Sequence, residues 1–336
     1  VAVTGVQTCA LPIFALAASP AFTYHALAQT AAPSTSSGQA FPTKPIRLII
    51  GFTAGSEVDV IGRMIAQEMS EKWGQRVVID NRPGAGSTVA GALVAAANPD
   101  GYTLFFNSVS HAATPALYPK APFDTLRDFA GVSQATSLPN VLIIAPSAGV
   151  RSMKELIANA KQKAIVNYGH AGVGSGTHIT GELFRQMAGL ELTHVPYKGV
   201  PEVITDAMTA RLNYAFAPIG NTLPFIKEKR LLALAVSTAT RAAPLPDVPT
   251  IAEAGLAGYV FDHWYGMFTQ AKTPRAIVNQ IAHEQARILN LPDVKDKITV
   301  RGAAIKTSSP EAFDAFVRAE AEKITKVMTA GGVKVQ

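Results

Sequence analysis

The sequence repeats one local pattern, a short apolar strand followed by a glycine-rich turn and then a helix. In the first copy the apolar run 46–50 precedes the turn 51–56, and apolar residues three and four positions apart mark a helix from about Val58. Three further turns of this kind lie at 81–88, 169–178 and 197–201. Because parallel strands need a crossover connection, the alternation predicts an α/β fold of mostly parallel sheets flanked by helices.

The same turns predict where a ligand binds. Ligands of parallel sheets lie at the carboxyl ends of the strands, and the first N–H groups of each following helix have no partner within the helix, which favours an anion. Since the turns are split between the two halves of the chain, we expect two lobes that face each other across a cleft. The small polar side chains of these turns suit a carboxylate better than bond breaking, although each Ser or Thr is equally suited to capping a helix.

Motifs for catalysis and for cofactors are missing or incomplete. No lysine follows a glycine, which excludes a P-loop, and neither paired-glycine turn completes a dinucleotide fingerprint. Ser175 lacks the frame of a hydrolase nucleophile. The seven histidines show no metal-ligand spacing, and a metal ion between His170 and His178 remains only an alternative. We therefore expect no enzyme, no cofactor and no metal.

The first 42 residues predict a leader and a linker. Residues 14–28 are apolar and alanine-rich, which is typical of the second half of a secretory signal peptide cleaved after Ala28. The charged start of such a peptide is missing, and residues 1–13 resemble a translated sequencing adapter, so we expect them to be non-native. The Ser/Thr/Pro/Gln-rich stretch 29–42 predicts a flexible linker. An exported protein whose only cysteine is Cys9 needs no disulfide framework.

Composition narrows the class of protein further. The chain has 336 residues, of which 48% are hydrophobic and 16% charged, so it can bury the cores of two domains. Its net charge of +6 comes from scattered Lys and Arg residues and predicts no nucleic-acid surface. No apolar run reaches the roughly 18–20 residues that span a bilayer. We expect a soluble monomer in the periplasm.

Several motifs resemble the Bug-type substrate-binding proteins of tripartite tricarboxylate transporters. They cover nearly the whole mature chain in order. The matching segments are residues 41–48, 55–59, 81–86, 99–104, 194–199, 231–236, 246–251 and 264–266. The resemblance implies a two-lobed receptor of the Venus-flytrap type, which closes by hinge motion on a small carboxylate and delivers it to integral-membrane transporter subunits.

The resemblance also implies how the lobes divide and which residues hold the ligand. Lobe 1 would comprise residues 43–143 and 265–336 and lobe 2 residues 144–264, with crossings near 142–146 and 264–268. The ligand would be an amino acid, a di- or tricarboxylate or an aromatic acid, held in part through ordered water. The implied ligand-binding residues are Phe52, Thr53, Ala54, Gly55, Ser56, Gly84, Ala85, Gly86, Ser87, Ser108, His111, Ser175, Thr177, His178, Tyr197 and Lys198.

Glu57 departs from the family pattern. The first turn of the family is commonly glycine-rich up to the aspartate, whereas here Glu57 precedes Asp59 at the start of the helix. We expect the side chain to face solvent and to cap the helix, where the dipole tolerates a negative charge. A side chain facing the cleft would instead repel a second ligand carboxylate or accept an ammonium group.

Two other functions remain open. The same site would serve a ligand-sensing partner of a membrane sensor kinase. A hydrolase on the same scaffold would use Ser175 as nucleophile and His111 or His178 as base.

Overall fold

The computed structural model describes residues 41–162, 166–330 and 332–333. The predicted adapter-like start, the signal peptide and most of the linker lie outside these residues. The end of the predicted linker, however, belongs to the fold. The Phe41 ring lies 5.0 Å from the Tyr102 ring and 6.0 Å from the Trp73 ring, and its carbonyl oxygen accepts a hydrogen bond from Gln280. Extending the flexible linker to residue 42 was therefore wrong.

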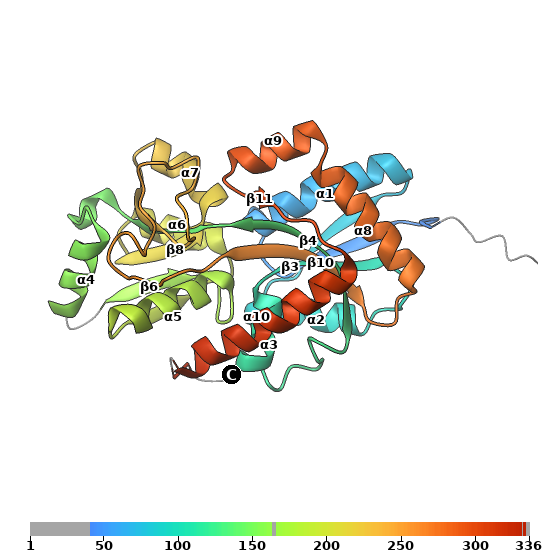
Figure 1. Ribbon diagram of the computed structural model, residues 1–336, viewed down its shortest axis with the longest axis horizontal. Coiled ribbons are helices and arrows are strands. Elements are labelled where there is room, and N and C mark those ends of the chain that lie inside the picture. The colour runs from blue at the N-terminus through green and yellow to red at the C-terminus, as the bar shows by residue number, and fades with distance from the viewer. Residues whose placement is uncertain (1–40, 163–165, 331, 334–336) are drawn as a thin grey trace, which may run out of the picture. The chain divides into compact units, whose positions relative to one another are not determined.

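Two β-sheets, each flanked by helices, organise the described residues (Figure 1). The first sheet has six strands in the order β11-β4-β10-β3-β1-β2, and the second has five in the order β7-β6-β8-β5-β9. The strands of the first are β1 (Ile46–Ile50), β2 (Val77–Asn81), β3 (Thr103–Ser108), β4 (Phe129–Leu138), β10 (His263–Gln270) and β11 (Ala304–Ile305). Those of the second are β5 (Asn140–Ile144), β6 (Asn167–His170), β7 (Thr193–Pro196), β8 (Tyr214–Pro218) and β9 (Leu232–Val236).

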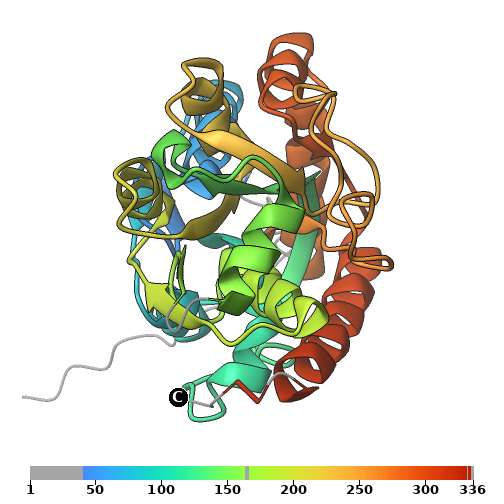
Figure 2. The same ribbon diagram turned by 90° about the vertical axis from the view of Figure 1, so that its left-hand side faces the viewer.

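The helices divide in the same way. With the first sheet go α1 (Glu57–Trp73), α2 (Thr88–Ala95), α3 (Ser110–Leu117), α8 (Arg275–Leu289), α9 (Pro292–Val300) and α10 (Pro310–Ala330). With the second go α4 (Met153–Gln162), α5 (Gly176–Ala188), α6 (Val200–Met208) and α7 (Ile219–Lys227). Two short 3₁₀ helices lie at Ala85–Ser87 and Pro146–Ala148. Figure 2 views the ribbon from the end at which the elements of the second sheet face the reader.

The sheets confirm a two-lobed α/β fold and place its crossings. Strands of the first sheet come from residues 46–138 and 263–305, and strands of the second come from residues 140–236. The chain thus changes sheet at Pro139 and again between residues 237 and 262. The predicted crossing near 142–146 was wrong, because β5 already pairs within the second sheet. The crossing predicted near 264–268 lies inside β10 of the first sheet. Both sheets belong to one compact unit, residues 40–336.

The expectation of mostly parallel sheets was wrong as well. Strand β1 pairs in parallel with β2 and β3, and β6 pairs in parallel with β7 and β8. The strands next to the lobe crossings are antiparallel: β10 pairs with β3 and β4, and β5 pairs with β8 and β9. A strand that enters a sheet directly from the other lobe has no helical crossover to set its direction, so these two strands make both sheets mixed.

Local sequence signals explain the helices that carry the site. In α1 the apolar residues Ile61, Ile65 and Met69 are fully buried, as their helical spacing predicts. The helix ends at Gly74, which adopts a left-handed conformation with φ of 63° and donates to the carbonyl of Ser70. Helix α9 and strand β11 had not been predicted. In the part of the chain that the structure describes, no helix combines the length and the apolar character that crossing a membrane requires.

Candidate functional site

Residues of both lobes line one small cavity. The first lobe contributes the start of α1, the end of β3 and part of β10. The second lobe contributes the starts of α5 and α6 and the ends of β6 and β8. The lining residues are Phe52, Ser56, Glu57, Val58, Ser108, Ala171, Ser175, Gly176, Thr177, Val200, Pro218, His263 and Tyr265. We call this the first cavity. About 20 Å³ of it can hold the centre of a water molecule, little more than one water needs, so the lobes are in close contact.

A second cavity adjoins the first and shares Phe52 and Ala171 with it. Its other lining residues come from the predicted turns of both lobes, together with Tyr118. These residues are Gly51, Gly84, Ala85, Gly86, Ser87, Gly172, Val173, Pro196, Tyr197 and Lys198. The two lobes meet directly here, because Tyr118 Oη donates a hydrogen bond of 3.1 Å to the carbonyl oxygen of Val173. A Cβ on Gly86, whose φ is +58°, would lie 2.4 Å from that same oxygen.

These cavities bring together most of the predicted ligand-binding residues. The predicted residues on the first cavity are Phe52, Ser56, Ser108, Ser175 and Thr177. Those on the second are Phe52, Gly84, Ala85, Gly86, Ser87, Tyr197 and Lys198. Three predicted residues of the first turn, Thr53, Ala54 and Gly55, line neither cavity. Neither of the predicted histidines, His111 and His178, lines a cavity.

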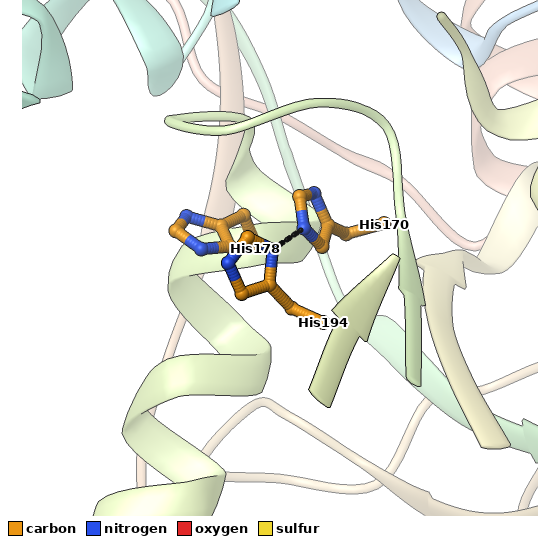
Figure 3. A group of neighbouring side chains, drawn as sticks. All are labelled: His170, His178 and His194. Atoms are coloured by element: carbon orange, nitrogen blue, oxygen red, sulfur yellow. Dashed lines mark hydrogen bonds between the residues drawn. The ribbon is translucent and has the colours of Figure 1, made fainter. Parts of the chain in front are cut away.

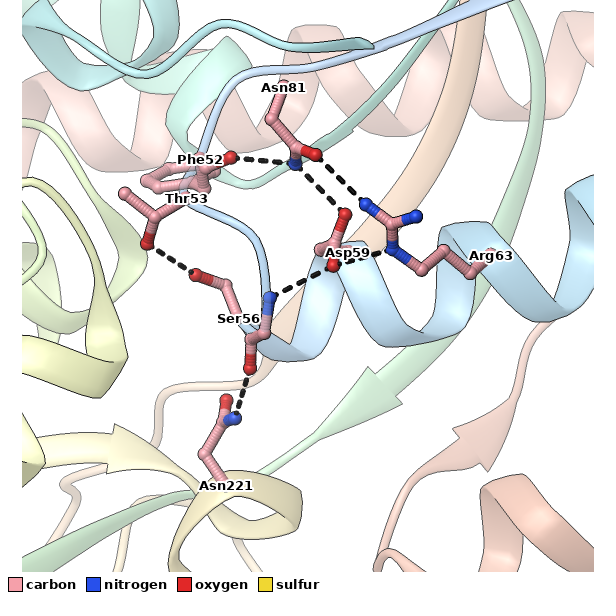
Figure 4. A network of polar contacts seen from close by, with 8 residues as sticks. Phe52, Thr53, Ser56, Asp59, Arg63, Asn81 and Asn221 are labelled. Atoms are coloured by element: carbon pink, nitrogen blue, oxygen red, sulfur yellow. Dashed lines mark hydrogen bonds and ion pairs between the residues drawn. The ribbon is translucent and has the colours of Figure 1, made fainter. Parts of the chain in front are cut away.

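Asp59 anchors the first turn (Figure 4). Its carboxylate accepts hydrogen bonds from the Gly55 amide, from Arg63 Nε and from Asn81 Nδ2, each 2.9 Å long. Asn81 Nδ2 also donates to the carbonyl oxygen of Phe52 at 3.0 Å. Burial alone would raise the pKa of Asp59, but these hydrogen bonds outweigh it and hold the pKa below its usual value. The charged Asp59 thus fixes the backbone that carries Phe52 and Ser56 to the cavity.

A network of four buried polar side chains connects the turn 81–88 to the end of β3 and the start of α3. Ser87 Oγ accepts from Asn107 Nδ2 at 2.8 Å and lies 3.1 Å from Ser110 Oγ. Ser110 Oγ donates to Asn107 Oδ1 at 3.2 Å and accepts from Ser108 Oγ at 3.0 Å. The network ties the end of β3 to the turn before α2. Asn107 and Ser110 were not among the predicted residues.

Three residues at the start of α5, Ser175, Gly176 and Thr177, line the first cavity. Ser175 caps the helix, and its Oγ accepts from the backbone N–H of His178 at 3.2 Å. Thr177 Oγ1 lies 3.0 Å from Ser175 Oγ and accepts from the Ala171 amide at 3.0 Å. Both hydroxyls thus hold the turn in shape. The histidine ring that a hydrolase would need forms no hydrogen bond to Ser175 Oγ among the contacts of the described residues.

The predicted solvent-facing position of Glu57 is wrong. The side chain is 0% exposed and lines the first cavity. Its Oε1 accepts from Arg301 Nε at 2.7 Å, and its Oε2 accepts from Arg301 Nη2 at 2.6 Å. Because this two-point pairing neutralises the carboxylate, Glu57 neither repels a ligand as a lone charge nor stands free to bind an ammonium group.

Glu57 also lies where the two lobes are joined. Asn221, at the start of α7, accepts from the Glu57 amide and donates to the Gly55 carbonyl, and both hydrogen bonds are 2.9 Å long. Arg301 Nη2 donates at 3.2 Å to the carbonyl oxygen of Gly220. Arg301 therefore holds Glu57 within its own lobe and reaches across to the other. No pattern around Arg301 or Asn221 in the sequence pointed to this role.

His111 lies in the core of the first lobe instead of on a cavity wall. Its ring packs 4.4 Å from the ring of Phe268, 4.6 Å from that of Phe129 and 5.6 Å from that of Phe105, measured between centroids. Full burial lowers its pKa to about 3, so the ring is neutral at physiological pH. The apolar neighbours leave His111 no route to a ligand in either cavity.

The charge of the first cavity decides how it can hold an anion. Among its lining residues no Lys or Arg occurs, and Glu57 is neutralised by Arg301. His263 is neutral too, because burial lowers its pKa to about 3, and its Nδ1 lies 3.1 Å from Asn140 Oδ1. An anion here would depend on the helix N-termini and the hydroxyls, while Lys198 places a positive charge on the second cavity.

A family model and similar proteins identify the family of the chain. The family model described as the tripartite tricarboxylate transporter family receptor matches residues 61–333. The UPF0065 protein in the tcbD-tcbE intergenic region of Pseudomonas sp. (strain P51) is 34% identical over 291 residues, which are 86% of this chain and 87% of that protein.

Two solved structures of Rhodopseudomonas palustris proteins are also similar. Rpa4515 with adipate has a TM-score of 0.85 at 34% identity, covering 88% of this chain and 100% of that one. MatC (Rpa3494) with bound malate has a TM-score of 0.81 at 29% identity, covering 85% of this chain and 99% of that one.

Proposed function

Because the chain belongs to the family of tripartite tricarboxylate transporter receptors, we propose that its first cavity binds a small dicarboxylate when the lobes close. The observation that carries the proposal is the convergence of two helix N-termini, those of α1 and α5, on one cavity whose lining has no unpaired charge. Each N-terminus favours one carboxylate group. The adipate and the malate in the two similar structures are both dicarboxylates.

Closure is part of this proposal. With the lobes as close as they are here, the first cavity has room for little more than one water molecule. A dicarboxylate therefore enters only after the lobes have separated, and the ligand-bound closed form keeps the lobes farther apart than in this structure. Binding energy then favours the closed form over the open one. We propose that membrane transporter subunits recognise the closed form; a sensor kinase would be the alternative partner. Neighbouring genes for two membrane subunits would favour transport, and a neighbouring kinase gene would favour sensing.

A panel of carboxylates tests the ligand class. Malate, adipate, citrate, glutamate and benzoate are compared by thermal shift, and calorimetry follows on each hit. A ligand present at 100 times its Kd should stabilise the protein by about 2.7 kcal/mol. We expect the dicarboxylates to bind most tightly. Absence of a shift with every acid, or turnover of esters and amides, would contradict the proposal.

Ser56 is the best single residue for placing the ligand. It lines the first cavity and precedes α1, yet its side chain forms no capping hydrogen bond. Ser56→Ala should therefore leave stability nearly unchanged while weakening dicarboxylate binding roughly 10- to 100-fold, as expected for a lost hydrogen bond to a charged group. Thr205→Ala is the matched control, because Thr205 is an exposed residue of α6 whose Oγ1 donates a hydrogen bond to the Pro201 carbonyl. Equal affinity of the two variants would place the ligand elsewhere.

We further propose that the protein is exported and that the leader is cleaved after Ala28. The small-x-small pattern before Gln29 supports this site. N-terminal sequencing of protein recovered from the periplasm of an expressing cell should begin at Gln29. For this experiment the adapter-like residues 1–13 are replaced with a short basic start. A first residue between positions 30 and 41 would instead indicate cleavage within the linker.

A further inference from the structure

Three histidines from separate elements of the second lobe meet at one point (Figure 3). His170 ends β6, His178 lies in α5 and His194 lies in β7. With one ring nitrogen taken from each residue, the three atoms lie within 4.8 Å of one another. His170 and His178 are buried, whereas His194 is exposed, so the cluster is open to solvent on one side.

Nitrogen atoms of this cluster lack the partners that buried imidazoles need. His170 Nε2 and His194 Nδ1 face each other at 3.0 Å, so only one of them can carry the proton between them. His178 Nδ1 accepts from the Gly174 amide at 3.2 Å. Its other ring nitrogen, Nε2, is buried and has no hydrogen-bond partner among the described residues. Leaving such an atom unpaired costs about 1–3 kcal/mol, so a bound ligand atom that pairs with His178 Nε2 would stabilise the site.

Each ring of the cluster has a nitrogen in position to face a metal ion. His170 Nδ1 and His178 Nε2 are buried without a hydrogen-bond partner among the described residues, and His170 Nε2 and His194 Nδ1 already face each other. Neutral imidazole is the form of histidine that coordinates a metal ion.

We propose that His170, His178 and His194 bind a divalent transition-metal ion, with zinc as the representative case. Three nitrogen ligands and no carboxylate favour zinc, copper or nickel over magnesium or calcium. With metal–nitrogen bonds of about 2.0–2.1 Å in a tetrahedral site, two ligand nitrogens lie about 3.3 Å apart. The pair His170–His194 is already close to this spacing. When the metal binds, the ring that carries the shared proton changes tautomer and keeps that proton on its other nitrogen, so both facing nitrogens offer a lone pair. Water enters as the fourth ligand beside the exposed His194.

Metal binding would be coupled to the ligand turn. An imidazole that coordinates through Nε2 carries its proton on Nδ1, so His178 would no longer accept from the Gly174 amide. Gly172 and Val173, which precede that amide, line the second cavity, and Ser175 lines the first. The structure thus connects the histidine cluster to the walls of both cavities through a single turn.

Zinc titration of the full chain tests the proposal. The protein is prepared without a histidine tag, treated with EDTA and titrated with ZnCl₂ by calorimetry. We expect one zinc ion per chain and a metal-dependent rise in the melting temperature. Cobalt(II) should give the intense visible bands of a tetrahedral site, which an ion loosely bound at the surface does not give.

Three variants separate this site from adventitious binding. His194→Ala alters an exposed edge-strand residue and should lower zinc affinity at least tenfold, and His178→Gln should do the same. His283→Ala is the matched control, because His283 is an exposed histidine on α8, and it should bind zinc like the parent. Absence of saturable binding in the parent protein would overturn the proposal. Unchanged affinity in His194→Ala would overturn it as well.

Discussion

Replacing Arg301 with alanine should lower the free energy of unfolding by about 3–5 kcal/mol, because it leaves a buried carboxylate without its partner. Glu57 is 0% exposed, and Arg301 supplies both hydrogen bonds between side chains that neutralise it. The loss also removes the hydrogen bond from Arg301 to the Gly220 carbonyl, so the contact between the lobes weakens too. Urea denaturation at pH 7 measures the change through the midpoint and slope of the transition.

Two further variants test whether the unpaired carboxylate of Glu57 causes the loss of stability in Arg301→Ala. In Arg127→Ala the lost ion pair with Asp128 is exposed, so the urea midpoint should stay where it is in the parent protein. The double variant Glu57→Gln/Arg301→Met removes both charges and should recover most of the lost stability. If Arg301→Ala proved as stable as Arg127→Ala, the Glu57 carboxylate would not be buried from water as the structure has it.

The burial of Glu57 and its pairing with Arg301 could not be predicted from the local sequence. The strand, the turn and the helix around it follow from local periodicity, which extends over only a few residues. Its partner, Arg301, lies at the end of α9 and is separated from it by 244 positions in the chain. A side chain between a glycine turn and a helix looks exposed until a distant element covers it. Tertiary packing, which local patterns do not encode, decided its environment.

The position of His194 and the antiparallel strands also depend on contacts between distant parts of the chain. The spacing of His170 and His178 gave no ligand pattern, because the third histidine comes from the neighbouring strand β7. The prediction of parallel strands was wrong for a related reason. Alternating strands and helices predict helical crossovers between parallel strands, but β5 and β10 enter their sheets from the other lobe and pair antiparallel. His111, by contrast, was placed in the site by resemblance, and its aromatic neighbours put it in the core.

Contact between the turns of the two lobes predicts a second large effect, at Gly199. This residue has an extended backbone with φ of −166°, which any amino acid adopts, so a side chain there causes no backbone strain. A Cβ on Gly199 would nevertheless lie 1.8 Å from Thr53 Oγ1, an atom of the first lobe. The added methyl group would also lie 3.0 Å from Thr53 Cβ, so it fits only when the Thr53 hydroxyl rotates away and the two turns move slightly apart.

Gly199→Ala should weaken dicarboxylate binding roughly 10- to 100-fold, since overpacking a closed contact costs about 1–3 kcal/mol. Calorimetry with the tightest acid of the panel measures the loss, and the urea midpoint should change little because each lobe keeps its own core. Replacing Thr53 with glycine removes both Thr53 atoms that the new Cβ would approach, Oγ1 and Cβ. The double variant Gly199→Ala/Thr53→Gly should then bind dicarboxylate as tightly as Thr53→Gly alone. If Gly199→Ala instead caused a folding defect, the double variant would bind more weakly than Thr53→Gly. Full affinity in Gly199→Ala would mean that the ligand is held without this approach of the lobes, and would refute closure as the basis of binding.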